Sequence, residues 1–283
     1  MKHQNNSLLA FGFLAMLLLL ACKQQNSDTA KGNPSAAKLN QADIERQEQI
    51  MQEHLVNGAW KEELYSREWQ EHIDRGLAKD STIAYLWQQK AMPLFKQAKY
   101  ELGMRYIDKA VKYDPERWQD YRAFIKCIFA KTYTEAIEDF QDYKSKYGNG
   151  FVMDHSCNFY IGLSYLQLNE FAKAEQVFEE DHQAQLKEYG VDWLHHLDLF
   201  YYGISRYEQK NYQGAIALFD QALAIYPDFS EVQIYKAKCL AKLGRTAEAE
   251  ALKALGEVNG RKGNTINEDS VIYERYPYQL RWN

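Results

Sequence analysis

The chain has 283 residues, of which 46% are hydrophobic and 14% aromatic, and its formal net charge is −5. This length suits one or two domains with a sizeable core, and 21 Tyr against only 5 Pro argue against wholesale disorder. The mild acidity and the lack of a long basic run exclude nucleic acid as the main partner, because phosphate binding needs clustered Lys and Arg.

The first predicted element is an apolar run of 14 residues from Leu8 to Ala21, preceded by Lys2. It is shorter than the roughly 20 residues of a membrane-spanning helix and fits the apolar region of a secretory signal. The run ends in Leu-Leu-Ala-Cys at Cys22, which resembles the lipobox of bacterial lipoproteins. The resemblance implies a signal peptide over residues 1–21 and a multiply acylated Cys22, with chains such as palmitate. The alternative is a plain signal peptide with an accidental cysteine.

Residues 22–40 are predicted to form the lipidated cysteine and a flexible tether, because this stretch is polar and contains Gly, Pro, Ser and Asn. Lipid anchoring places the protein in the cell envelope. Lys23 and Gln24 lack the aspartate that retains some lipoproteins at the inner membrane. We therefore expect the outer membrane, with the protein facing the periplasm.

Small residues recur at a helical-repeat period through the centre of the chain. One series of alanines is spaced by 38, 41 and 34 residues, and in two units a glycine lies 12 residues earlier, at Gly162 and Gly203. The series is Ala136, Ala174, Ala215 and Ala249. Small residues in both halves of a unit let two antiparallel helices approach closely, while Phe178 and Phe219 fill the space beside them. Such hairpins bury their apolar faces only when they stack.

The unit from His196 to Phe229 resembles the tetratricopeptide repeat (TPR) family, and the resemblance extends over roughly residues 60–256. It implies an all-α solenoid of about four to five helical hairpins within residues 41–256. The repeat-packing positions that it implies are Ala91, Ala110, Ala136, Gly162, Ala174, Gly203, Ala215, Phe219, Ala222, Pro227 and Ala249.

Some positions depart from the repeat. The long spacing before Ala215 predicts an extended second helix that ends near Gly190, with Asp192 capping the next helix. Pro93 falls inside a predicted first helix, where it should cause a kink or a break.

The TPR resemblance also implies a concave groove lined by first-helix positions. Carried onto this chain, those positions are mainly aromatic, which suits binding of a protein or peptide. The candidates are Tyr85, Phe95, Trp118, Tyr121, Phe129, Phe159, Phe200 and Tyr207. The alternative is that several of these rings pack between repeats.

No residue pattern supports catalysis or a cofactor: a nucleophile elbow, an HExxH zinc motif and a phosphate loop are all missing. His195 and His196 are adjacent and point in different directions on a helix, so a metal would need a distant third ligand. We expect a solvated helix start there and no metal site. The odd number and scattered positions of the remaining cysteines predict buried core residues. These are Cys127, Cys157 and Cys239.

The favoured function is therefore a membrane-anchored scaffold for a protein or peptide of unknown identity. Its more specific form is a helper in envelope assembly or secretion. The alternatives are a metal-binding or enzymatic protein built on the solenoid, and a purely structural envelope component.

The last predicted segment, residues 257–283, is a loop followed by an extended aromatic tail. Pro277 prevents a helix through the tail, and rings such as Tyr273, Tyr276 and Trp282 would be poorly placed in water. The tail should therefore pack on the solenoid. It can cap the last hairpin or enter the groove, and the cap is favoured because it needs no long excursion.

Overall fold

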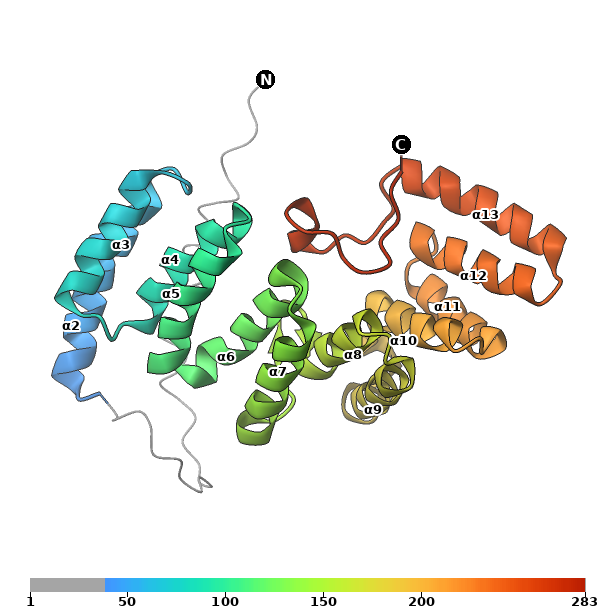
Figure 1. Cartoon of the computed structure of the whole chain (residues 1–283), viewed down its shortest axis with the longest axis horizontal. Helices are drawn as coiled ribbons and strands as arrows, with labels where there is room; N and C mark the ends of the chain where they lie inside the picture. Colours follow the sequence, from blue (N-terminus) through green and yellow to red (C-terminus); the bar gives the residue numbers. More distant parts are fainter. Residues whose placement is uncertain (1–38, 283) are drawn as a thin grey trace. The chain divides into compact units, whose positions relative to one another are not determined.

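The structure is a computed structural model that describes residues 39–282. The predicted signal peptide, Cys22 and most of the predicted tether lie outside the described residues. Within the described range the chain is helical except for turns, the C-terminal segment and one short β-hairpin, as Figure 1 shows. Every helix in this range falls short of the length or hydropathy that a bilayer-spanning segment requires. The predicted all-α fold is confirmed.

The first unit is formed by α2 (Gln41–Met51) and α3 (Arg67–Lys79). Between them lie a π-helical turn, η1 (Gln52–Val56), and a 3-10 turn, η2 (Ala59–Lys61). Side chains of this unit, among them Trp69, are buried together with the start of the following helix. The unit therefore covers the N-terminal end of the repeats, as a capping element of an array does.

Five helical hairpins follow in residues 84–261, and each one contacts the next (Figure 1). The hairpins are α4 (Ala84–Lys96) with α5 (Tyr100–Tyr113), α6 (Pro115–Phe124) and its π-helical end η3 (Ile125–Ala130) with α7 (Tyr133–Tyr147), α8 (Cys157–Gln167) with α9 (Phe171–Tyr189), α10 (His196–Glu208) with α11 (Tyr212–Ile225), and α12 (Ser230–Lys242) with α13 (Thr246–Arg261). A two-stranded antiparallel hairpin, β1 (Phe151–Val152) and β2 (His155–Ser156), separates α7 from α8, and the 3-10 turn η4 (Val191–Trp193) separates α9 from α10.

Each hairpin turns through one residue in the left-handed region. The five residues have φ between 58° and 78°, and they are Ala98, Lys131, Asn169, Lys210 and Gly244. In four of the turns, the N–H of the next residue bonds to a carbonyl five positions earlier, which satisfies a helix-end group. Glycine adopts this conformation without strain, whereas lysine and alanine adopt it at a cost.

Glycines set the close approach inside three hairpins. A Cβ added to Gly203 or Gly162 would lie 2.4 Å or 2.7 Å from the ring of Phe219 or Phe178 on the second helix. In the first hairpin the pairing is reversed, because Gly103 belongs to the second helix and faces Phe95 of the first. The repeat-packing alanines are fully buried or nearly so, and Pro227 is exposed directly after α11.

Pro93 lies inside α4, which continues through it to Lys96. Of the predicted kink or break, the break is therefore ruled out. Proline has no N–H, so the carbonyl of Gln89 loses its usual helical partner. The indole N–H of Trp69 donates to that carbonyl at 3.2 Å. The neighbouring unit thus supplies the hydrogen bond that the proline removes.

The irregular spacings have a clear structural origin. α9 is 19 residues long and ends at Gly190, as expected from the spacing. The cap of α10 differs from the expectation: His195 occupies it in place of Asp192, and its Nδ1 accepts the N–H of Leu197. α13 ends at Arg261, beyond the predicted limit of the solenoid at residue 256.

Candidate functional site

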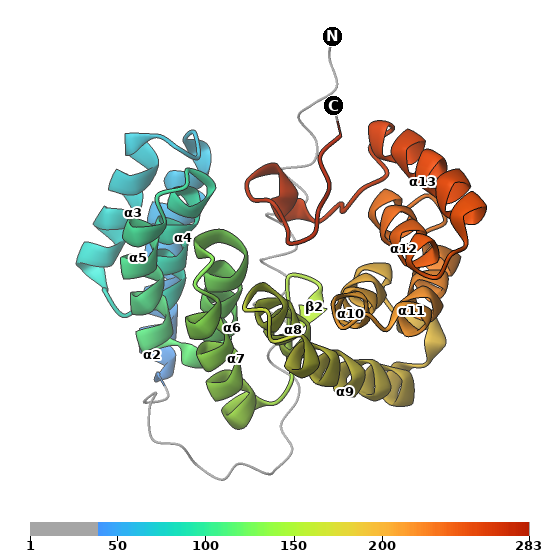
Figure 2. The same cartoon turned by 45° about the vertical axis from the view of Figure 1, so that its right-hand side comes forward.

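The residues after α13, 262–282, form a tail that lies along the first helices of the hairpins. Figure 2 shows it turning back from α13 toward α6 and α8. At the far end of its path, next to the 3-10 helix η5 (Asp269–Ile272), the ring of Tyr273 lies 5.0 Å from the Lys96 Nζ at the end of α4. The tail then runs back, and Trp282 ends against α13. We call the covered surface, formed by α4, α6 with η3, α8, α10 and α12, the first-helix face.

Side chains of the first-helix face bond to the main chain of the tail. The bonds are Lys131 Nζ to the Arg275 carbonyl (2.9 Å), the Tyr201 hydroxyl to the Pro277 carbonyl (2.8 Å), and the Leu280 N–H to the Glu231 carboxylate (3.2 Å). Glu231 has no exposed surface, and burial raises its pKa. The face therefore holds an irregular segment largely through backbone groups, which is how a surface binds a peptide.

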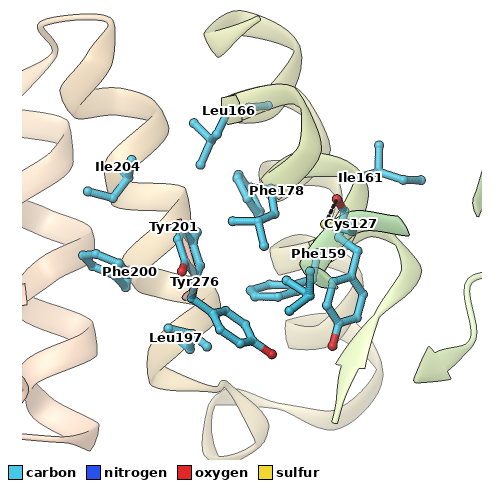
Figure 3. Close-up of a cluster of buried hydrophobic side chains, with 14 of the residues drawn as sticks. Cys127, Phe159, Ile161, Leu166, Phe178, Leu197, Phe200, Tyr201, Ile204 and Tyr276 are labelled. Carbon is cyan, nitrogen blue, oxygen red and sulfur yellow. Dashed lines mark hydrogen bonds between the residues drawn. The ribbon is translucent and has the colours of Figure 1, made fainter. Parts of the chain in front are cut away.

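Tyr276 is the most deeply buried aromatic ring of the tail, at 2% exposure. Figure 3 shows it beside Phe159, Tyr201 and Leu197, which belong to α8 and α10. The tail therefore does both things that were predicted as alternatives. It covers the last hairpin, where Tyr278 contacts Tyr235 and Leu280 bonds to Glu231, and it also runs over the first helices of the earlier hairpins. Trp282 packs against Gly260 of α13, whereas Tyr276 and Tyr278 contact side chains of the first helices.

The eight predicted groove residues lie in two environments. Five are buried, at 8% exposure or less: Phe95, Trp118, Phe129, Phe159 and Phe200. The other three are half-buried: Tyr85, Tyr121 and Tyr207. The buried rings form inter-helix contacts, such as Phe95 with Phe129 and Phe200 with Phe219. The structure does not bring these eight residues together as an open aromatic surface. The five buried rings instead fit the alternative prediction, in which rings pack between helices of the array.

His155 forms an ionic clamp at the centre of the array. It has no exposed surface, its Nδ1 lies 2.6 Å from Asp198 of α10, and its Nε2 lies 3.4 Å from Glu268 of the tail. Burial opposes a charge on the ring, but the two carboxylates outweigh this and raise the pKa of His155 to about 10. The charged ring therefore ties β2 to α10 and to the tail.

Within the described residues one group of side chains has the spacing of a metal site: His155, His195 and Asp198, with ligand atoms within 4.8 Å of one another. The expectation of a merely solvated helix start is therefore wrong, because His155 from β2, at the start of the preceding hairpin, completes the cluster. Both nitrogens of His155 already face carboxylates, however: Nδ1 is hydrogen-bonded to Asp198, while Nε2 lies within ion-pair distance of Glu268 without a hydrogen bond. The ring is therefore held as an imidazolium cation between two carboxylates. Burial and the charge of His155 lower the pKa of His195.

The three cysteines of the described residues are free and buried, as predicted. Burial raises the pKa of each thiol to about 12. A thiolate nucleophile is therefore strongly disfavoured at Cys127, Cys157 and Cys239. The chemistry that the arrangement offers is binding through backbone, aromatic and carboxylate groups.

Sequence reasoning missed the residues that hold the tail, chiefly Lys131, Tyr201 and Glu231. Glu231 carried a usable signal, because Phe229, Val232 and Ile234 around it are apolar and a carboxylate needs a partner when it is buried. The partnership of His155 with Glu268 carried no such signal, because the two residues belong to unrelated segments.

Comparison with known proteins identifies the repeat. Residues 206–255 match the family described as tetratricopeptide repeat. No curated protein shows significant sequence similarity to the chain.

Solved structures share the fold at low sequence identity. PilW, described as a widely conserved type IV pilus biogenesis factor, is 13% identical with a TM-score of 0.58, covering 79% of this chain and 96% of PilW. A tetratricopeptide repeat protein from Parabacteroides merdae is 14% identical with a TM-score of 0.56, covering 81% and 96%. YrrB, described as a TPR protein with an unusual peptide-binding site, is 13% identical with a TM-score of 0.50, covering 68% and 94%.

Proposed function

Because residues 206–255 belong to the tetratricopeptide repeat family and the hairpin architecture extends over the described chain, we propose that this protein is a scaffold that binds a protein or peptide partner. The observation that carries the proposal is the tail. The first-helix face holds an irregular polypeptide segment by main-chain hydrogen bonds and aromatic contacts. The description of YrrB as having a peptide-binding site supports the same use of this fold.

The tail itself limits how a partner can bind. A tethered segment has an effective concentration on the order of millimolar, so a free peptide competes poorly with it for the first-helix face. The partner is therefore expected on surfaces that the tail leaves open.

Site-specific photocrosslinking in cells tests this function. A benzoylphenylalanine residue is placed, one position at a time, at exposed apolar positions on different elements. Suitable positions are Leu102, Val191, Ile225 and Leu255. A scaffold gives a discrete protein adduct at some positions and none at others. The absence of an adduct at every position contradicts the proposal.

The finer proposal is that the scaffold is tethered to a membrane of the cell envelope, most simply the outer membrane, facing the periplasm. Its support is the apolar run that ends in Leu-Leu-Ala-Cys at Cys22. A role in envelope assembly or secretion is a further proposal. The structural likeness to a pilus biogenesis factor supports it only in that the two proteins share a fold.

Replacing Cys22 tests the anchor. The Cys22→Ser variant should leave the membrane fraction or accumulate unprocessed, because the acylated thiol is lost. If this variant is processed at the same bond and still sediments with membranes, the lipid anchor is refuted while the scaffold proposal stands.

A further inference from the structure

Two insertions into the repeat lie in neighbouring hairpins. The spacings of 38 residues from Ala136 to Ala174 and of 41 from there to Ala215 are the longest in the series. The extra residues form the β1–β2 hairpin after α7, and the last turns of α9 with η4. In repeat proteins, such insertions collect on one face, which is often the binding face.

The two insertions meet around a cavity of about 520 Å³. Phe151, Met153 and Asp154 line it from the β-hairpin, and Gln185 and Trp193 line it from the other insertion. This volume falls within the range of pockets that bind small molecules, and a few side chains of a protein partner would fill it. The cavity is separate from the tail, since His155 lies between Asp198 at the cavity and Glu268 of the tail.

The rim of the cavity is apolar and exposed. Trp193 is 60% exposed, Phe151 48% and Met153 39%, and next to them Val191 is 68% exposed. Large apolar side chains gathered in this way on a surface mark an interaction site.

The floor of the cavity is polar and held by hydrogen bonds. Gln185, which is 6% exposed, donates to Asp181 at 2.8 Å and to Asp198 at 3.3 Å. Ser156 of β2 donates to the same carboxylate oxygen of Asp181 as Gln185 does. The two insertions are thus linked through buried polar groups, so the cavity walls are preorganised.

The charge of the cavity is negative. Asp154 is exposed and has no ion-pair partner among residues 39–282. No lysine or arginine lines the cavity. None occurs in the sequence from Gly148 to Ala172 or from Glu188 to Ser205. An occupant with a positive charge is complementary to this surface.

We propose that this cavity binds a protein segment that presents an arginine or lysine beside an apolar or aromatic side chain. The basic group pairs with the Asp154 carboxylate and lies against the ring of Trp193, as cations do over indole rings. The apolar side chain fills the space between Phe151 and Met153. This inference rests on the proposed scaffold function and gives it a site and a class of partner.

Peptide probes test the site with the purified chain bearing Cys22→Ser. Three capped hexapeptides share a Gly/Ser background and contain an Arg–Phe, a Glu–Phe or an Arg–Gly pair. Calorimetry should find that the Arg–Phe peptide binds most tightly.

Asp154→Asn should weaken the binding of the Arg–Phe peptide about fivefold, the upper range for an exposed ion pair. Trp193→Ala should weaken it about tenfold or more, as for a hot-spot ring. The matched controls Glu250→Gln and Leu255→Ala, both exposed on α13, should leave the affinity unchanged.

Equal binding of all three peptides, or Arg–Phe binding that survives both cavity variants, overturns the inference. So does stoichiometric zinc binding that depends on His195 in a chain that binds none of the three peptides, because the cluster would then be a metal site. The photocrosslinking series separates the two proposals. Adducts at Leu102 or Ile225 but not at Val191 leave the scaffold function standing and remove this site, whereas no adduct anywhere removes both.

Discussion

Gly203 sets how closely α10 and α11 approach each other. Because a Cβ at this position would lie 2.4 Å from Phe219, Gly203→Ala should lower the free energy of unfolding by about 1–3 kcal/mol, as overpacking does. Urea unfolding measures the effect. The double variant Gly203→Ala with Phe219→Leu should regain part of the loss. An alanine variant as stable as the parent would show that the hairpin is not tightly packed here.

His155 makes stability depend on pH. Its folded pKa of about 10 lies above the usual 6.5, so between these values the folded chain keeps a proton that the unfolded chain has lost. This stabilising contribution is complete below about pH 6.5 and is lost as the pH rises toward 10. The unfolding free energy should therefore fall between pH 7 and pH 10, and it should fall less steeply in His155→Gln. Parallel pH profiles for parent and variant would contradict the clamp.

At the scale of the element, the hairpin turns are a source of strain. Lys210 has φ of 63° between α10 and α11, whereas Gly244 has φ of 78° between α12 and α13. Lys210→Gly should raise the free energy of unfolding by up to about 1 kcal/mol, and Gly244→Ala should lower it by a similar amount or more. Thermal unfolding of both variants provides the comparison. The same direction of change in both would mean that the left-handed turns do not control stability.

The tail is the element with the largest predicted effect. Deleting residues 264–283 uncovers the environment of Tyr276 and leaves the buried carboxylate of Glu231 without the Leu280 N–H. We expect a lower free energy of unfolding and increased binding of a dye that reports exposed apolar surface. A truncated chain with the parent's stability and dye binding would show that the tail is a passive appendage.

At the scale of the whole molecule, the hairpins were predictable and the path of the tail was not. Close helix approach requires small residues at fixed positions within one unit, so Gly203 and Ala215 revealed the repeat directly. Rotation by one residue moves a side chain about 100° around a helix, and this is why rings such as Phe159 and Phe200 were assigned to an open groove although they are buried.

The candidate site depends on residues that no local pattern connects. The clamp joins His155 to Asp198, 43 positions later, and to Glu268 in the tail. The cavity is formed by two insertions whose only trace in the sequence is the longer spacing between repeats. The spacing indicated that residues had been inserted, but only the fold shows that the insertions meet.

Hydrogen exchange along the tail of the full chain tests most directly that the first-helix face is filled. The Leu280 N–H donates to the buried Glu231, and the N–H groups of Glu274, Tyr276 and Gln279 donate within the tail, which the face holds through the Arg275 and Pro277 carbonyls. Mass spectrometry should find slow exchange in peptides from residues 274–282, comparable to the first helices on which they lie. Exchange there as fast as in an unfolded chain would contradict a tail bound to the first-helix face.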